Sequence, residues 1–176
     1  MIDFMVVGLP RSGTTWASAW LTTDTSLCWH DPLYQMHYMD WDERLARPGK
    51  SVGVSCTGVW RWIDWLCRHP ARKVILHRDI GEVMLSMAQI GLPHSDLEHG
   101  ATLLEQIDGL HVPFSDLFDL ERGKLIWEFL MTDKPYNVDR HKLMIDIEMQ
   151  PKFSGLTVNK DVTRKLVAEI MDACNE

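Results

Sequence analysis

FMVVGLPRSGTTW, residues 4–16, runs from an apolar segment through a glycine-containing turn into ASAWL, residues 17–21. The nearly all-apolar run over residues 2–7 is typical of a buried strand in a parallel sheet. The segment from Thr14 to about Leu21 reads as a helix. A turn of this kind presents backbone N–H groups and the positive end of a helix dipole to an anion. The stretch therefore predicts a strand, a phosphate-binding loop and a helix, as at the start of an α/β fold.

Strand-like and helix-like segments continue to alternate along the chain. Further strands are predicted at residues 26–30, 51–56, 73–77 and 142–149. Helices are predicted at residues 59–69, 80–91, 114–132 and 160–174, whereas 94–109 is ambiguous between a helix and an irregular insert. This alternation favours a single α/β domain over residues 1–176, with a central parallel sheet between two helical layers, a three-layer α/β/α arrangement. Ligands of such sheets bind at the carboxyl ends of the strands.

Composition narrows the possible partners. The net charge of −7 gives no general positive field for nucleic acid, so any anion site must be local. The beginning of the sequence does not read as a signal peptide, and no apolar run is long enough to suggest a membrane span. The cysteines form no CxxC pair and no zinc signature, which favours reduced thiols in a cytoplasmic protein. They are Cys28, Cys56, Cys67 and Cys174.

The turn has the Walker A glycine spacing, Gly8 and Gly13, but lacks the lysine that follows in ATP- and GTP-binding loops. Thr14 and Thr15 stand there instead and offer hydroxyl donors. Arg11 brings a positive charge into the loop itself. The alternative is an ordinary strand-to-helix turn whose polar residues only cap the helix.

PRSGTTW, residues 10–16, resembles the 5′-phosphosulfate loop of sulfotransferases, which use 3′-phosphoadenosine 5′-phosphosulfate as sulfuryl donor. The resemblance implies a P-loop NTPase-like fold without a metal requirement. It also implies that Arg11 stabilises charge on the leaving phosphate and that Trp16 stacks on adenine. The donor-binding residues implied in this loop are Arg11, Ser12, Gly13, Thr14, Thr15 and Trp16.

A second segment, KVILHRDIGEVMLS, places Arg78 at a strand end and Ser86 eight positions later. It resembles the 3′-phosphate site of the same family, and a guanidinium and a hydroxyl can converge on one phosphate. The alternative is that Arg78 pairs with Asp79 or Glu82 on the surface and that Ser86 has no special role. HKLMIDIEM, residues 141–149, resembles the family's late strand more weakly.

Two departures from the family concern the 3′-phosphate and the catalytic base. The sequence lacks the C-terminal Arg-Lys-Gly loop of many members, and Lys152 or Lys160 are only guesses for a substitute. Cys56 stands where cytosolic members place a histidine, and it reads as a small buried residue. Other branches use a carboxylate after the second strand, which implies Asp31 as base, with His30 as second candidate.

Both candidates for the base have plainer interpretations. Asp31 precedes Pro32 and is a common type of turn residue, and His30 reads as a strand-end surface residue. The remaining histidines in unpatterned regions are interpreted as structural or solvated. They are His37, His94, His99 and His111.

The sequence thus predicts a sulfotransferase that forms adenosine 3′,5′-bisphosphate and sulfates a hydroxyl, less often an amine. The expected acceptor is a small molecule or carbohydrate, with no nucleic acid, membrane or metal. A non-catalytic nucleotide-binding module of the same fold is the main alternative. A P-loop kinase is less favoured because the Walker lysine is absent.

Overall fold

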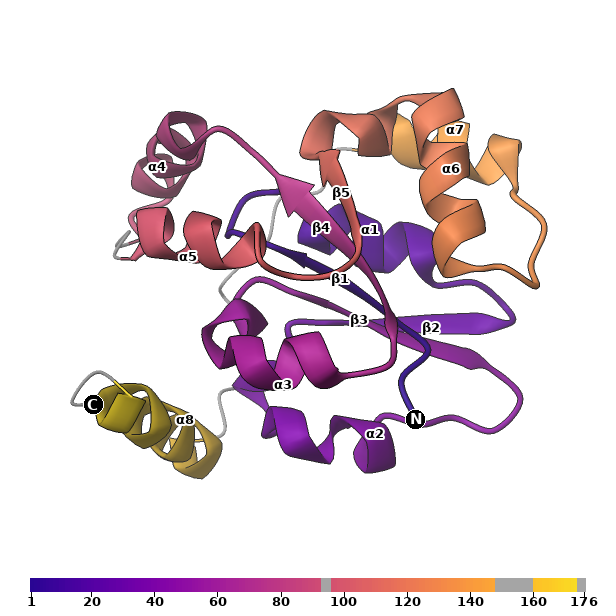
Figure 1. Cartoon of the computed structure of the whole chain (residues 1–176). Helices are drawn as coiled ribbons and strands as arrows, with labels where there is room; N and C mark the ends of the chain where they lie inside the picture. Colours follow the sequence, from indigo (N-terminus) through magenta and orange to yellow (C-terminus); the bar gives the residue numbers. More distant parts are fainter. Residues whose placement is uncertain (93–95, 148–159, 174–176) are drawn as a thin grey trace.

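The computed structural model describes residues 1–92, 96–147 and 160–173. Five strands form one all-parallel sheet in the order β2-β3-β1-β4-β5 (Figure 1). Their bounds are β1 Phe4–Gly8, β2 Ser26–His30, β3 Ser51–Cys56, β4 Arg72–His77 and β5 Leu110–Pro113. The first strand of the chain therefore lies at the centre of the sheet.

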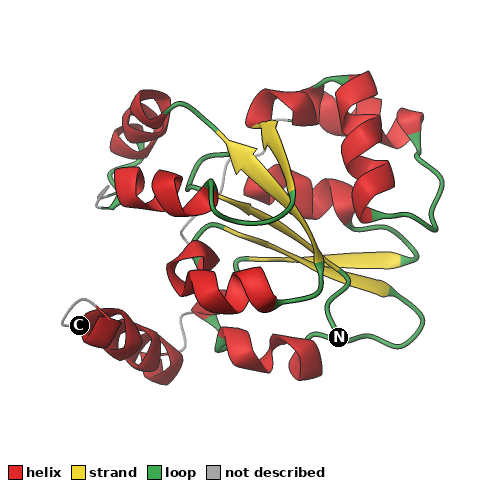
Figure 2. Ribbon diagram, viewed as in Figure 1, coloured by secondary structure: helices red, strands yellow, loops and turns green. Residues whose placement is uncertain are grey.

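Helices cover both faces of this sheet (Figure 2). The α-helices are α1 Thr14–Leu21, α2 Trp41–Arg44, α3 Ile63–Arg68, α4 Ile80–Gln89, α5 Leu97–Leu104, α6 Leu120–Leu130, α7 Val138–Ile145 and α8 Lys160–Ala173. Short 3₁₀ helices are η1 Pro32–Tyr34, η2 Tyr38–Asp40, η3 Val59–Trp62 and η4 Phe114–Phe118. No helix within the described residues is both long and apolar enough to cross a membrane.

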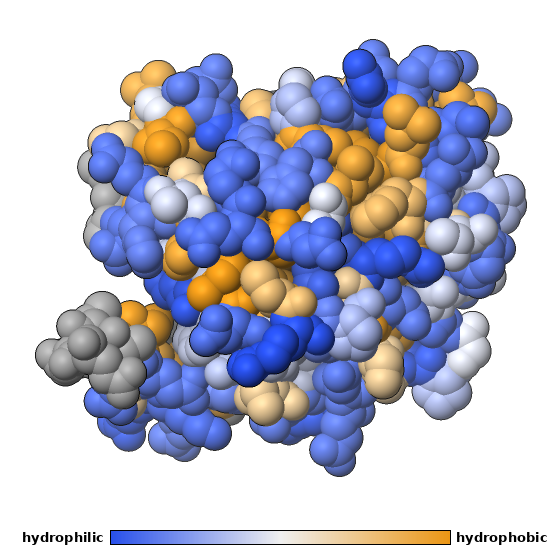
Figure 3. All heavy atoms as spheres, viewed as in Figure 1, coloured by the Kyte–Doolittle hydropathy of each residue, from blue (hydrophilic) through white to orange (hydrophobic). Residues whose placement is uncertain are grey.

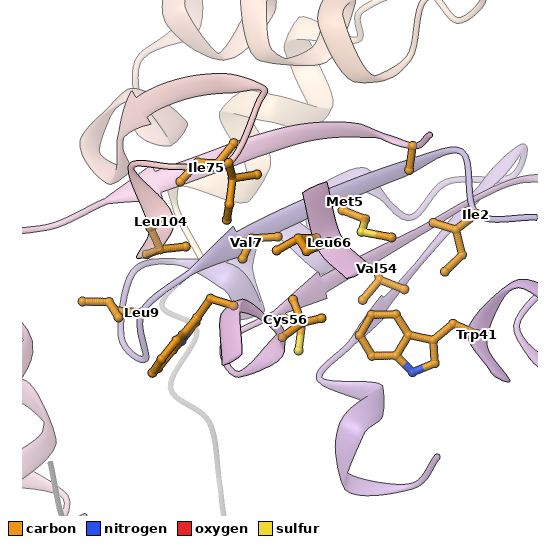
Figure 4. Close-up of a cluster of buried hydrophobic side chains, with 14 of the residues drawn as sticks. Ile2, Met5, Val7, Leu9, Trp41, Val54, Cys56, Leu66, Ile75 and Leu104 are labelled. Atoms are coloured by element: carbon orange, nitrogen blue, oxygen red, sulfur yellow. The ribbon is translucent and has the colours of Figure 1, made fainter. Parts of the chain in front are cut away.

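Successive side chains of β1 enter two different cores, because neighbouring strand residues point to opposite faces of the sheet. Met5 and Val7 pack with residues of α2 to α5, and Figure 4 shows part of this cluster. Phe4 and Val6 pack with residues of α1, α6 and α7. All five residues of β1 are buried, which confirms the prediction of a buried strand in a parallel sheet.

The direction of the chain connections creates a switch point between β1 and its neighbour β4. From β1 the chain passes through α1, on one face of the sheet, toward the β2 edge. From β4 it passes through α4 and α5, on the other face, toward the β5 edge. In open parallel sheets, ligands bind where neighbouring strands diverge in this way, at their carboxyl ends. The loops after β1 and β4 lie there.

The strand predicted at residues 142–149 is wrong. Residues 142–145 belong to α7, Asp146 and Ile147 form a turn, and Glu148 lies outside the described residues. Asn137 caps this helix by accepting a hydrogen bond from the Arg140 N–H, and the helix buries His141 and Met144. The local alternation of apolar and polar residues therefore does not mark a strand, because this segment belongs to a helix with its own cap and its own buried face.

Two other differences concern the β5 side of the sheet. The fifth strand is β5, which the sequence analysis did not predict because it has only four residues. The ambiguous segment 94–109 contains α5. The helix predicted at 114–132 is divided into η4 and α6, where the Asp119 side chain accepts hydrogen bonds from two backbone N–H groups and begins α6.

Candidate functional site at the carboxyl edge of the sheet

The loop between β1 and α1 has a sharply curled backbone. Gly13, the N-cap of α1, has a φ of 83°, and Arg11 has a φ of 66°. The left-handed region is accessible to glycine but costs a residue with a side chain roughly 1–2 kcal/mol. A non-glycine residue held there marks a segment where the surrounding structure dictates the backbone, as at many binding sites.

The Arg11 side chain joins this loop to α4. Its Nε donates a hydrogen bond of 2.9 Å to the Ser86 Oγ. The pKa of Arg11 is lowered, first by partial burial of the guanidinium and then by the positive charge of Arg78. Two like charges this close repel each other, so an anion bound between them would lower the energy of the site.

Arg78, immediately after β4, contacts the β1–α1 loop. Its Nη1 donates a hydrogen bond of 2.5 Å to the Arg11 carbonyl oxygen, across a separation of 67 residues in sequence. Its Nε donates to the Glu82 Oε2 at 3.1 Å, and its guanidinium lies 4.3 Å from the centre of the Phe114 ring. The predicted pair Arg78 and Ser86 is thus brought to the phosphate loop. The plainer alternative, a pairing with Glu82, is also present.

The other polar residues of the loop and of the first turn of α1 differ in what they contact. Ser12 is fully buried, and within the described structure its hydroxyl has no hydrogen-bond partner. Thr14 is buried, and its carbonyl accepts a 2.7 Å hydrogen bond from the Ser55 hydroxyl of β3. The Thr15 Oγ1 lies 3.1 Å from the His30 Nε2. Contacts from this loop therefore reach both β3 and β2.

Trp16 is the one predicted donor-binding residue of this loop whose ring lies in the core. It is 4% exposed, and its Nε1 donates a 2.8 Å hydrogen bond to the Met144 carbonyl. Its ring packs against Trp20, Phe118 and His141. Adenine could stack on Trp16 only if some of these neighbours moved.

His30 and Asp31 lie together at the end of β2. Asp31 has a φ of 43° and follows the last strand residue, so the strand alternation that would separate the two side chains no longer applies. The His30 Nε2 lies 3.2 Å from the Asp31 Oδ2. Asp31 is 8% exposed, whereas the His30 side chain is 32% exposed.

The Asp31 carboxylate is held by Thr57, just after β3. Its Oδ1 accepts hydrogen bonds from the Thr57 N–H at 2.6 Å and from the Thr57 hydroxyl at 3.1 Å. The negative charge also acts on two neighbours. The pKa of Cys56 is raised well above its usual value, mainly by burial and then by Asp31, and burial with Asp31 likewise raises the pKa of Tyr34. Cys56 is a buried, protonated thiol, as the sequence analysis expected of a small core residue.

A cluster that the sequence analysis missed lies at the ends of β4 and β5. His77, Glu105 and His111 surround a pocket of about 360 Å³ that Arg78 and Asp79 also line. The sequence alone indicates only a structural or solvated role for His111. The three residues come from separate segments, so no short spacing in the sequence marks them. The best available signal was that His77 and His111 lie in neighbouring strands, but this can be recognised only once β5 is known.

Two of the other histidines singled out in the sequence have contacts or positions that the structure describes. The His37 Nε2 lies 2.7 Å from the Glu169 Oε1 of α8. His99 is exposed on α5, and His94 and Lys152 lie outside the described residues. Comparisons with protein-family models, curated proteins and solved structures found no match to this chain.

Proposed function

We propose that this protein is a sulfotransferase that transfers a sulfuryl group from 3′-phosphoadenosine 5′-phosphosulfate to a hydroxyl acceptor. The observation that supports it is the convergence of two separate motifs at the β1/β4 switch point, where Ser86 of α4 and Arg78 after β4 both form hydrogen bonds with Arg11 of the β1–α1 loop. A three-layer, P-loop-like classification and a cytoplasmic location belong to the same proposal.

The residues of the loop fit the two phosphate-bearing ends of such a donor in different ways. Arg11 and the N–H groups at the start of α1 suit the phosphosulfate, and the buried Ser12 hydroxyl offers a further donor. Arg78 and Ser86 suit the 3′-phosphate. Trp16 does not fit an adenine contact in this arrangement, so the base would rest on other residues. When bound, the donor supplies the sulfuryl group, and Arg11 stabilises charge on the leaving phosphate.

The base is proposed to be His30, with Asp31 as the residue that positions it, which reverses the order favoured by the sequence. Asp31 is nearly buried and its Oδ1 already accepts two hydrogen bonds from Thr57, while its Oδ2 faces the His30 Nε2 at 3.2 Å. His30 is more exposed and contacts Thr15 beside the loop. If the Nε2 of His30 carries the proton that it shares with Asp31 or Thr15, its Nδ1 is the basic nitrogen.

A non-catalytic nucleotide-binding module is the second candidate. It is favoured by the burial of Trp16 and by the ion pair of Arg78 with Glu82, since both reduce what the site offers a donor. Such a module would bind adenosine 3′,5′-bisphosphate without turnover. A kinase is disfavoured because Thr14 occupies the Walker lysine position.

Calorimetry with adenosine 3′,5′-bisphosphate and with ATP plus Mg²⁺ tests the nucleotide assignment. We expect the bisphosphate to bind at least about tenfold more tightly, because a single charge-assisted contact to its 3′-phosphate contributes roughly 1.5–3 kcal/mol. Equal or tighter ATP binding would overturn the assignment. Sulfation of a panel of phenols, sugars and amines then separates the enzyme from the non-catalytic module.

A further inference from the structure

We propose that His77, Glu105 and His111 form a binding site for a divalent transition-metal ion of the zinc class. The three side chains come from the end of β4, the end of α5 and β5. Each offers one ligand atom, and these atoms all lie within 4.8 Å of one another. The proposal does not rest on the proposed function of the β1–α1 loop, although Arg78 borders both sites.

The hydrogen bond of His111 to the backbone assigns its protons. The Nε2 of His111 lies 2.8 Å from the Ile107 carbonyl oxygen, which can only accept. In the neutral ring, Nε2 therefore carries the proton and Nδ1 keeps a lone pair. A histidine whose second nitrogen donates to a carbonyl is the usual arrangement at metal sites, because that bond fixes the ring and its tautomer.

The remaining contacts of the cluster place acceptors against one another. The Nδ1 of His111 lies 2.8 Å from the Nε2 of His77, which must donate to it. The Nδ1 of a neutral His77 is then an acceptor, and it lies 3.4 Å from the Oε1 of Glu105, also an acceptor. A positive centre, either a second proton on His77 or a metal ion, would make this contact favourable.

The geometry suits a metal ion with tetrahedral coordination. With metal–ligand bonds of about 2.0–2.2 Å, two ligand atoms on a tetrahedron lie about 3.3–3.5 Å apart, close to the separation of His77 and Glu105. His77 would bind the ion through Nδ1, the nitrogen that faces Glu105, and the His111 Nδ1 would exchange its hydrogen bond with the His77 Nε2 for the ion. The movement needed is limited, because the three ligand atoms already lie within 4.8 Å of one another. Two imidazoles and one carboxylate favour zinc and its neighbours over magnesium, which prefers oxygen ligands.

The surroundings leave room for a further ligand. The pocket beside the cluster is also lined by Arg78, Asp79 and Pro113. Three protein ligands and one open position are typical of metal sites that bind a water molecule or a substrate atom rather than purely structural ones. In Figure 3 the visible face is mostly hydrophilic, but hydrophobic residues reach the surface in its central part. An ion here would join β4, β5 and the end of α5.

The test is zinc affinity, measured by competition with a chromophoric zinc indicator on the full chain. All proteins would carry Cys67→Ser, because Cys67 is an exposed thiol that could bind zinc by itself. We expect the parent to bind one zinc ion with micromolar or tighter affinity and to show much weaker binding of Mg²⁺. We expect Glu105→Gln and His111→Ala each to weaken zinc binding by about 100-fold. Loss of a residue that only hydrogen-bonds a metal ligand weakens binding by roughly 10- to 100-fold, and loss of a ligand should cost at least as much.

The controls separate a site from general surface binding and from misfolding. His99→Ala removes an exposed histidine of α5 outside the cluster and should leave zinc affinity unchanged. Glu105 is 70% exposed, so Glu105→Gln should not disturb folding, which circular dichroism would verify. Zinc should also raise the melting temperature of the parent but not of Glu105→Gln. Absence of binding up to 100 µM zinc, or equal affinity in the parent and both cluster variants, would overturn the proposal.

Discussion

The loops after β1 and β2 each hold a non-glycine residue in the left-handed region, but they use it in opposite ways. Arg11, after β1, places a cation beside a second cation, Arg78. Asp31, after β2, places an anion against the hydrogen-bond donors of Thr57. At the first position two cations lie together, one of them also paired with Glu82, whereas at the second the carboxylate is held by local hydrogen bonds. Under the proposed function the first loop receives an anion and the second positions a neighbouring side chain.

The largest expected effect separates the two residues at the end of β2. If His30 is the base, His30→Gln should lower turnover by roughly two to four decades, the usual contribution of a positioned base. Asp31→Asn keeps the shape of the turn and should lower turnover less, while shifting the pH profile because the partner of His30 loses its charge. Steady-state rates across pH, with donor affinity measured separately, would decide.

The reverse ranking of these two variants would restore the sequence-based preference for Asp31. Near-normal turnover in both would place the base elsewhere. Tyr34→Phe is a suitable control, since Tyr34 lies in the same turn and its pKa is raised by burial and by Asp31, so it stays neutral.

The next effect concerns Arg11 itself. Arg11→Ala should reduce turnover by about two decades while reducing donor affinity much less, because charge on the leaving phosphate grows only in the transition state. Arg11→Lys keeps the charge and should recover part of the rate. Single-turnover kinetics with measured donor dissociation constants would separate the two quantities. Loss of affinity alone would mean that Arg11 only anchors the donor.

Arg78 should affect binding rather than rate. Arg78→Ala should weaken adenosine 3′,5′-bisphosphate by about one to two decades, the value of one charge-assisted contact, and weaken adenosine 5′-phosphate far less. Glu82→Gln is the matched variant, because Glu82 is the carboxylate that Arg78 contacts. It should leave affinity unchanged or raise it a fewfold.

Calorimetry with both nucleotides would measure these differences. If Arg78→Ala weakens the two ligands equally, its hydrogen bond to the Arg11 carbonyl is its main role and it supports the loop structurally.

The sequence predicted the centre of this fold better than its edge. The buried strand β1, the helix α1 and the strands β2 to β4 were predicted, because each carries a continuous apolar or strongly patterned run. β5 is too short to carry such a pattern, and the alternation over residues 142–149 imitated a strand inside α7. The structure of a short segment depends on the elements that pack against it, and the local sequence pattern carries no information about those elements.

In the candidate site too, residues next to clearly patterned strands were predicted, and residues that depend on short or misassigned elements were not. The resemblance predicted Arg78 and Ser86 as a pair on one phosphate, and this remains a prediction, whereas their hydrogen bonds with Arg11 were not predicted because they depend on how β4 and α4 lie beside the β1–α1 loop. The burial of Trp16 under α7 was not, because it depends on a helix that was taken for a strand. The cluster around His111 was missed for the same reason, since it requires β5.

The smallest expected effect is on the free energy of unfolding, and it tests the left-handed backbone conformation that Arg11 and Asp31 share. Arg11→Gly relieves a left-handed φ of 66° and loses the side-chain contacts of Arg11, including its hydrogen bond to Ser86, so we expect its unfolding free energy to stay within about 1 kcal/mol of the parent. Asp31→Gly relieves a similar φ of 43° but leaves the Thr57 N–H without its acceptor, and should cost about 2–3 kcal/mol. Urea unfolding with unchanged slopes would compare them directly. Equal losses in both variants would show that the Arg11 contacts stabilise its loop as strongly as those of Asp31, which would remove the contrast between a loop arranged for a ligand and one arranged for its neighbours.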